Sequence, residues 1–220
     1  MEIAADQPVN QKLNGFRLGW LESLITCQSS GRKLRLLIDE EGLNIQRKYR
    51  LEEVNKIRTI AETREAYKKL GNDPNRYRPS ADSLMRRIVK GMGIYSINNV
   101  VDMLNLISIQ SGFSIGGYDS SAISGNIELG IGKSGEPYNG IGRGDLNITN
   151  LPILRDDISA FGTPTSDSER TMIKDATHNI LFVFFDFGCN SSLDEYLTKS
   201  TELLSVHCSA QKSRIGIHAF

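Results

Sequence analysis

The hydrophobic residues change their spacing along the chain, and these changes predict where helices and strands lie. Residues 16–28 mix aromatic and β-branched side chains, which predicts a strand near the edge of the core. Between 51 and 70 the hydrophobic positions step by three and four up to Gly71, which predicts an amphipathic helix that ends at this glycine. A second helix is predicted from Ser80, its expected N-cap, to a stop at 91–93. The first half of the chain is therefore predicted to be mainly helical.

Beyond residue 116 the pattern changes to short apolar stretches separated by glycines, which is typical of strands joined by tight turns. The run 179–187 is apolar and aromatic almost throughout and predicts a central strand. Residues 191–209 return to helical spacing, and 218–220 are consistent with a tail. Helices early, strands in the middle and a helix last predict an α+β domain.

Residues 97–112 combine an apolar helix pattern with a line of polar side chains. Asn98, Asp102 and Asn105 recur at spacings of four and three, so they share one helix face. A buried polar group without a partner costs roughly 1–3 kcal/mol, so this face requires partners. Two interpretations stay open: a structural seam that ties the helix to neighbouring backbone, or the floor of a ligand pocket.

Composition is that of an ordinary globular protein and narrows the function classes. The chain has 220 residues, of which 39% are hydrophobic and 24% charged, and no run of apolar residues is long enough to cross a bilayer. The first residues lack the features of a signal peptide, so a cytoplasmic location without membrane association is expected. Three cysteines, each expected to be buried, and three histidines show no metal-ligand spacing, so neither a metal nor a cofactor is expected.

Charge is zero overall but unevenly distributed. Residues 31–90 hold 16 basic against 9 acidic residues (+7), whereas 101–220 hold 8 against 14 (−6). This asymmetry is compatible with a basic surface for nucleic acid, and equally with helices that carry solvated charge.

Familiar catalytic motifs are not present. The glycines between 125 and 144 lack the Gly-Lys-Ser/Thr ending of a phosphate-binding loop. Asp156 and Asp157 lack a third ligand and are expected to form a turn. No serine, cysteine and histidine form a recognisable triad, although triads need not be close in sequence.

Several short motifs, in order, resemble one known family. They are Ser96–Asp102, Asn105, Gly117–Asp119, Gly135–Glu136, Ser168–Thr171 and Ala176–Asn179, with Arg78–Ser80 and Arg86–Arg87 upstream. Together they resemble the B3/B4 editing domain of the phenylalanyl-tRNA synthetase β subunit, and the upstream part resembles free-standing members without a synthetase attached. The resemblance covers 78–186 of an expected single domain, 1–220, in which 1–77 is an N-terminal strand and helical elaboration and 187–220 a C-terminal helix and tail.

The resemblance implies an α+β fold with helices packed around a β-sandwich-like core, the B3/B4 fold. It also implies hydrolysis of tRNA wrongly charged with tyrosine, in which a pocket that hydrogen-bonds the tyrosine hydroxyl rejects phenylalanine. The chain departs from the bacterial form, which has a histidine in the turn at 115–117 and a glycine-rich loop at 167–171. Since the charging module is absent, the chain is not a complete phenylalanine–tRNA ligase.

The resemblance assigns candidate residues to three roles. Ser168, Arg170 and Thr171 would be catalytic, with Arg170 as a cationic fork for a carboxylate, phosphate or oxyanion. The substrate would be bound by Asn99, Asp102, Asn105, Tyr118 and Asp119. RNA would be bound by Arg78, Arg86 and Arg87, although surface arginines are usually only solvated.

The leading hypothesis is therefore a free-standing, RNA-binding domain that acts in trans on aminoacyl-tRNA as a deacylase. Without an evident nucleophile, hydrolysis would use a positioned water. Two alternatives stay open: a non-catalytic module that binds tRNA or a free aromatic amino acid, and a small-molecule hydrolase that has kept the pocket.

Replacing Asp102 with alanine tests the polar face directly. If its partners are buried, Asp102→Ala leaves them unpaired and should lower the free energy of unfolding by roughly 1–3 kcal/mol. Chemical denaturation measures this, and an unchanged unfolding midpoint would show that Asp102 is solvated.

Overall fold

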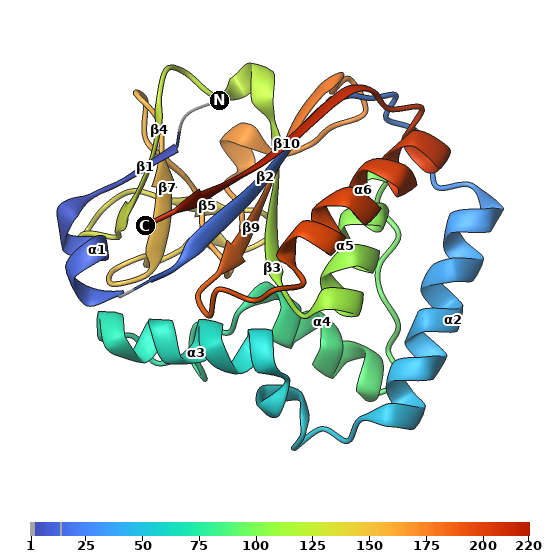
Figure 1. Cartoon of the computed structure of the whole chain (residues 1–220), viewed down its shortest axis with the longest axis horizontal. Helices are drawn as coiled ribbons and strands as arrows, with labels where there is room; N and C mark the ends of the chain where they lie inside the picture. Colours follow the sequence, from blue (N-terminus) through green and yellow to red (C-terminus); the bar gives the residue numbers. More distant parts are fainter. Residues whose placement is uncertain (1–2, 14) are drawn as a thin grey trace.

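Two four-stranded sheets and a layer of helices build the protein (Figure 1). The computed structural model describes residues 3–13 and 15–220. The central sheet has the order β10 (Gln211–Ala219), β2 (Arg17–Leu24), β9 (Asn179–Asp186) and β3 (Ser114–Asp119), all antiparallel. The outer sheet has the order β1 (Ile3–Ala5), β4 (Ile127–Ile131), β7 (Pro152–Arg155) and β8 (Ala160–Gly162). The fold is thus α+β with a sandwich-like arrangement of sheets, as the sequence predicts.

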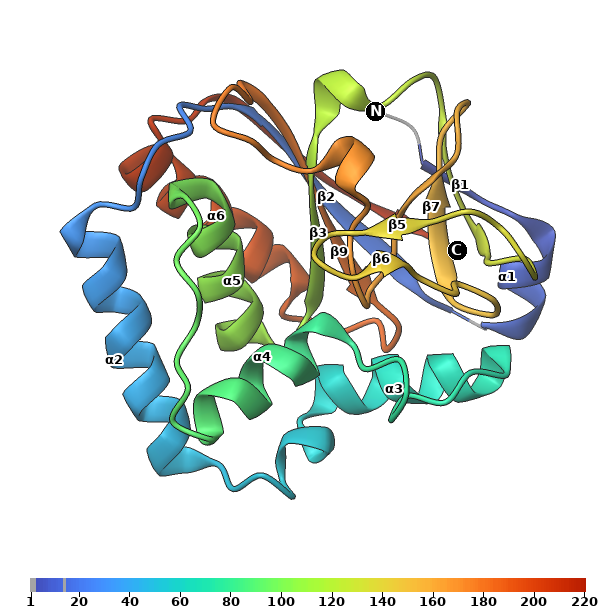
Figure 2. The same cartoon turned by 180° about the vertical axis from the view of Figure 1, so that it is seen from behind.

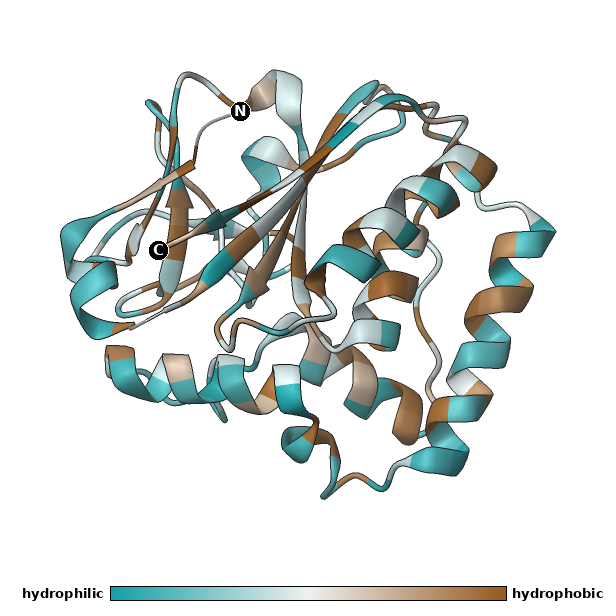
Figure 3. Ribbon diagram, in the orientation of Figure 1, coloured by the Kyte–Doolittle hydropathy of each residue, from teal (hydrophilic) through white to brown (hydrophobic). Residues whose placement is uncertain are grey.

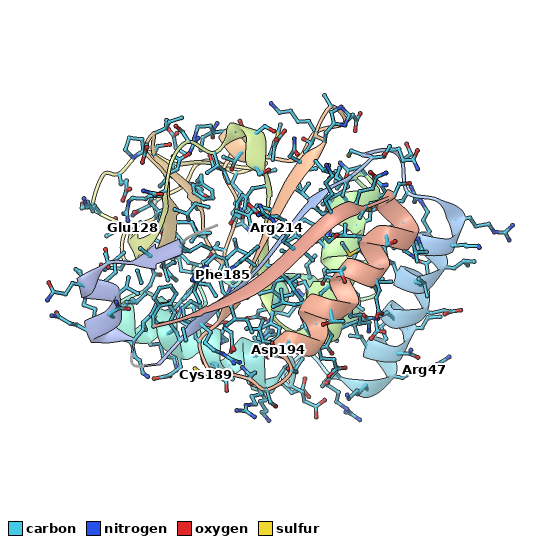
Figure 4. All side chains as sticks on the ribbon, turned by 45° about the horizontal axis from the view of Figure 1, so that its top comes forward. Arg47, Glu128, Phe185, Cys189, Asp194 and Arg214 are labelled. Carbon is cyan, nitrogen blue, oxygen red and sulfur yellow. The ribbon has the colours of Figure 1, made fainter. Side chains whose placement is uncertain are left out.

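Strand β9 is buried on both faces and separates two hydrophobic cores. Ile180, Phe182 and Phe184 belong to the core shared with the helices. Leu181, Val183 and Phe185 alternate with them and belong to the core shared with the outer sheet. Neighbouring strand residues point to opposite faces, so a continuous apolar run serves both cores at once. The prediction of a central strand at 179–187 is confirmed, and Phe185 lies inside the molecule beneath β10 in Figure 4.

Five helices lie on the other face of the central sheet or along its edges (Figure 2). They are α2 (Arg32–Lys48), α3 (Arg58–Leu70), α4 (Ser80–Val89), α5 (Asn99–Ser111) and α6 (Leu193–Cys208). Gly19 of β2 leaves room for Leu193 and Leu197 of α6, because a β carbon at this position would collide with both leucines. Helix α2 lies outermost and leaves Leu36, Leu37 and Leu43 exposed, so its ribbon carries hydrophobic as well as hydrophilic residues in Figure 3. None of the helices in the described ranges is long and apolar enough to cross a bilayer.

Smaller elements lie on the side of the molecule that holds the outer sheet. Helix α1 (Gln7–Lys12) follows β1, and a hairpin of β5 (Asn139–Gly140) and β6 (Gly144–Asp145) projects between the outer sheet and the helices. Strand β1 pairs in parallel with β4, so the N-terminal segment completes the outer sheet.

Several local predictions need correction. The helix expected from residue 51 begins at Arg58, after the 3-10 turn η1 (Val54–Lys56), although it ends at Gly71 in the left-handed conformation as expected. Ser80 is the first residue of α4 rather than its cap, because Pro79 takes the N-cap position. Residues 211–219 are no tail but strand β10, paired along β2.

The cysteines differ in burial. Cys208 is buried and Cys27 is half-buried, and burial raises the pKa of both thiols, that of Cys208 to about 12. Cys189 is exposed, contrary to expectation, and lies in the connection from β9 to α6 (Figure 4). A raised thiol pKa suppresses the thiolate, so Cys27 and Cys208 are poor nucleophiles.

Candidate functional site

The polar face of α5 begins with two asparagines that hold neighbouring backbone. Asn98 is the N-cap and accepts a hydrogen bond from Val101 N (2.9 Å). Buried Asn99 accepts from Gln28 N (2.9 Å) and donates to two carbonyls, those of Thr26 and His207 (both 2.9 Å). The side-chain oxygen and nitrogen of Asn99 are thus both hydrogen-bonded. Asn99 ties α5 to the segment after β2 and to α6, which supports a structural role.

Asp102 anchors the connection that leads into α5. Its carboxylate is buried and accepts from Ser30 Oγ (2.6 Å), Ser96 Oγ (2.8 Å) and Ile97 N (2.8 Å). These three donors fix the segments before α2 and before α5. The assignment of Asn99 and Asp102 to a substrate pocket is therefore corrected, because their polar atoms are already occupied by the protein.

A cavity of about 250 Å³ lies beside α5, one turn further along the same face. It is enclosed by α4, α5, β3, the β5–β6 hairpin and the segment 167–173, and these elements meet in Figure 2. The apolar side chains of its wall are those of Leu84, Ile97, Val101, Leu104, Ile115, Ile141, Met172 and Ile173. The polar side chains in the wall are Ser80, Asn105, Ser108 and Asp167. A mostly apolar wall with a few polar groups is the usual form of a small-molecule site.

Asp167 is the one ionisable side chain in this wall. Its Oδ2 accepts from Gly117 N (3.0 Å), whereas its buried Oδ1 has no hydrogen-bond partner among the described residues. The residue as a whole is half-buried, so its carboxylate end is turned inward. Burial raises the pKa of this carboxyl to about 7, against the opposing effect of the Gly117 amide and the Tyr118 hydroxyl.

Two further buried polar atoms near Asp167 lack partners among the residues that the structure describes. They are Tyr118 Oη and Thr171 Oγ1. The Tyr118 hydroxyl fits between Gly116 and Gly162, since a β carbon on either glycine would collide with it. Burial, followed by the charge of Asp167, raises the pKa of Tyr118 well above its usual value. Its hydroxyl is near enough to Asp167 to lower the pKa of that carboxyl, although the two groups do not form a well-aligned hydrogen bond. Tyr118 is not part of the cavity wall.

The polar face therefore contributes Asn105 to the cavity. Asn105 is half-buried, and its amide forms no hydrogen bond with any residue that the structure describes. Ser108, one turn on, donates to Phe113 O (2.7 Å) and is satisfied. Asn105 thus retains both a donor and an acceptor for a ligand.

The residues predicted to be catalytic do not line the cavity. Arg170 binds Asp156 (2.8 Å) and donates to Ala122 O (2.9 Å), and Ser168 accepts from Arg170 N as the cap of the 3-10 turn η3 (Glu169–Thr171). Asp156 also accepts backbone amides, so the expected turn at 156–157 is confirmed. The segment Ser168–Thr171 is absent from the cavity wall, which takes the residues on either side of it, Asp167 and Met172.

Asp119, predicted to bind substrate, is occupied elsewhere. Its carboxylate accepts from Ser121 N (3.0 Å) and Thr177 Oγ1 (2.8 Å) and closes the turn after β3. Neither Asp119 nor Tyr118 is part of the cavity wall.

The arginines predicted to bind RNA lie on α4 or, in the case of Arg78, just before it. Buried Asp82 accepts from Arg64 (2.8 Å) and Arg86 (2.6 Å), with Arg78 at 3.8 Å. Three arginines against one carboxylate leave a net charge of +2 (3 − 1) at this cluster. Arg87 instead stacks on Tyr95, 3.8 Å from the ring centroid. Positive charge thus remains along α4, although part of it holds Asp82.

Other surfaces are less suited to a ligand. Three larger depressions, of about 560, 490 and 290 Å³, lie beside β10, beside the β5–β6 hairpin and between α2 and the end of α4. Mostly polar side chains line the first two, whereas the third has a largely apolar wall without a buried polar group that lacks a partner among the described residues. Within residues 3–13 and 15–220, no cluster of three or more histidine, cysteine, aspartate or glutamate side chains could hold a metal ion.

The sequence-based reasoning missed Asp167 even though it included the polar segment that follows. The available signal was an aspartate within a segment rich in threonine and serine, from Thr163 to Ser168. In the structure Thr163, Thr165 and Ser168 are buried. Ile97, inside a quoted motif, and Ile141, at the hairpin tip, were also not assigned to the site.

The class of protein that this architecture defines is an α+β domain with a small, mostly apolar cavity between helices and a sheet edge. The family model of the B3/4 domain matches residues 62–188, more than half of the chain. The chain therefore belongs to the B3/4 domain family, as the resemblance over 78–186 indicates.

The chain is similar to a solved structure over almost its whole length. That structure is an N-terminal fragment of the phenylalanyl-tRNA synthetase β-subunit from Pyrococcus horikoshii, with 11% sequence identity and a TM-score of 0.47. The comparison covers 97% of this chain and 49% of that one, so this chain spans about half its length. A search of curated proteins finds no match in sequence.

The raised pKa of Asp167 predicts how stability depends on pH. A carboxyl with a folded pKa of about 7 and an unfolded pKa near 4 binds more protons in the folded state between these values. The free energy of unfolding should therefore fall as pH rises from about 4 to 7, and Asp167→Asn should remove this fall. Three pKa units correspond to at most about 4 kcal/mol, and water at the half-buried residue reduces the effect.

Urea unfolding of both proteins between about pH 5 and 8 measures this dependence. The matched control is Asp119→Asn, which removes a carboxylate outside the cavity wall and should leave the fall assigned to Asp167 in place. Parallel profiles for wild type and Asp167→Asn would contradict the assignment of a raised pKa to Asp167.

Proposed function

We propose that the chain is an editing-type domain that binds an aromatic aminoacyl group of aminoacyl-tRNA in the cavity beside α5 and hydrolyses its ester in trans. The observation that carries the proposal is Asp167, whose buried carboxylate has one oxygen without a partner among the described residues and lies in a mostly apolar wall. A phenol ring fits this chemistry, because its hydrocarbon part suits the apolar wall and its hydroxyl can donate to Asp167.

The same arrangement supports discrimination against phenylalanine. A site built to bind a hydroxyl rejects the analogue without it, because the buried polar group then remains unpaired. This is the direction that removal of misattached tyrosine requires. Membership in the B3/4 family, related by resemblance to a synthetase β subunit, adds support for a tRNA-linked substrate.

Hydrolysis would use a water oriented by the cavity. Asn105 offers an unpaired amide for an ester carbonyl or for that water. Ser80 and Ser108 are the hydroxyl side chains of the wall, and no histidine stands beside them in it, which supports hydrolysis without an acyl-enzyme. A domain that binds tyrosine without hydrolysis remains the second candidate, favoured by this lack of an activated nucleophile.

Release of labelled amino acid from Tyr-tRNA and Phe-tRNA, both carried on the tRNA specific for phenylalanine, tests the proposal. Wild type should release tyrosine in preference to phenylalanine. Asp167→Asn replaces the carboxylate oxygen that faces the ligand by an amide donor. It should reduce tyrosine release by roughly 10- to 100-fold, because one hydrogen bond to a charged group is lost. Release of phenylalanine should change little.

Asp119→Asn is the matched control, because it neutralises a nearby carboxylate that lies outside the cavity. Tyrosine binding without release would select the binding module. Neither binding nor release of tyrosine would refute the proposed function.

Binding of tRNA should depend on salt through α4. Log affinity should fall with log salt at a slope of about −0.7 for each phosphate contacted in a single strand. Lys90 at the end of α4 is exposed and forms no ion pair with a described residue, so Lys90→Gln should reduce the slope by about one such unit. Lys212→Gln in β10 is the charge-matched control, and equal slopes in both variants would contradict a contact at α4.

A further inference from the structure

Tyr95 differs from every other aromatic residue of the chain in its exposure. It is 66% exposed, whereas all other aromatic side chains, each within the described ranges, are buried or half-buried. It lies in the connection from α4 to α5, which runs between α2 and α5 in Figures 1 and 2. This exposure leaves the Tyr95 ring accessible to a ligand.

Arg87 covers one part of the Tyr95 ring. Its guanidinium lies 3.8 Å from the ring centroid and donates to Met92 O (3.3 Å), the carbonyl of a residue in the same connection. The stack orients the ring, and the exposure of Tyr95 shows that most of the ring still faces solvent. An arginine–aromatic pair of this kind provides a flat, cationic surface on which a nucleobase can stack.

The pair stands next to the mouth of the cavity. Leu84 in the wall is one helical turn before Arg87, and Ile97 in the wall is two residues after Tyr95, a distance of about 7 Å along extended backbone. Ile97 is itself 60% exposed, so it belongs both to the wall and to the outer surface. A ligand whose end enters the cavity would therefore extend across Ile97 towards Tyr95.

The position of this surface is fixed in advance by Asp102. The Asp102 carboxylate accepts hydrogen bonds from Ser96 Oγ and Ile97 N, and these two residues directly follow Tyr95. A surface that is already ordered loses little conformational entropy when a ligand binds. Charge favours an anionic ligand on the α4 side, where Arg87 and Lys90 lie, because Asp39 of α2 faces the other side of the connection.

From these observations we infer that Tyr95, supported by Arg87, is a stacking platform for the nucleobase of the nucleoside that carries the aminoacyl ester. The inference rests on the proposed function and adds the part of the substrate outside the cavity. The amino-acid side chain occupies the cavity, the ester lies at its mouth beside Ile97, and the terminal base stacks on the Tyr95 ring.

Two small ligands separate the platform from the cavity. One is L-tyrosinamide, which has only the part for the cavity, and the other is 3′-(L-tyrosylamino)-3′-deoxyadenosine, whose amide cannot be hydrolysed as an ester. Wild type should bind the nucleoside conjugate more tightly. Tyr95→Ala should weaken binding of the conjugate by about 5- to 150-fold, the contribution of one stacked base, and leave binding of tyrosinamide unchanged.

Three variants serve as controls. Tyr95→Phe keeps the ring and should bind both ligands as wild type does. Tyr95→Trp should also retain affinity, and its indole fluorescence should change when the conjugate binds. Ile158→Ala removes a side chain that is 62% exposed and outside the cavity wall, so neither affinity should change.

The outcomes distinguish this inference from the proposed function. The platform would be overturned if Tyr95→Ala weakened binding of both ligands equally. It would also be overturned if Tyr95→Ala weakened binding of neither ligand, and the Tyr95 ring would then be assigned to a contact with protein. If wild type fails to bind tyrosinamide, the proposed function fails. In that case, binding of a short RNA that ends in CCA and carries no amino acid tests the platform. Weaker binding to Tyr95→Ala than to wild type supports the platform, and equal binding overturns it.

Discussion

Burial of β9 on both faces is the constraint on which the rest of the structure depends. Every residue from Ile180 to Asp186 is buried, and the side chains alternate between the helical core and the core of the outer sheet. An antiparallel strand covered on both sides requires a layer on each face. Helices α5 and α6 cover one face and the outer sheet the other, so the edge strand β3 comes to lie beside α4 and α5, where the cavity forms.

Buried polar groups then fix the connecting segments that the hydrophobic cores do not hold in place. Asn99 holds the segment after β2, and Asp102 holds the segment that carries Ile97. Each is satisfied by several hydrogen bonds, so these contacts fix one arrangement of connections that would otherwise be irregular. Asp167 differs because one of its oxygens has no partner among the described residues, and the contrast separates groups that hold the fold from a group available to a ligand.

The site joins segments that are distant in the sequence. Asn105 lies on α5, Asp167 precedes η3, and Ile141 lies at the tip of the β5–β6 hairpin. Arg170 illustrates why residue type alone misleads: its guanidinium suits an anionic ligand, yet a buried carboxylate, Asp156, is within 2.8 Å and occupies it. Arg78 and Arg86 near Asp82 show the same effect, because a charge buried in the protein attracts neighbouring charges before any ligand can.

The sequence by itself determined the α+β class, the central strand, the buried helix with its polar face and the family, because these depend on local periodicity and on ordered motifs. Only the tertiary structure decided that β10 is a strand, that Asn99 and Asp102 are anchors, and that Asn105 and Asp167 share a cavity. Spacing along a helix fixes which side chains share a face. It cannot fix which backbone groups or charges face them, since those partners come from segments as distant as Thr26 and His207 and meet only when the cores form.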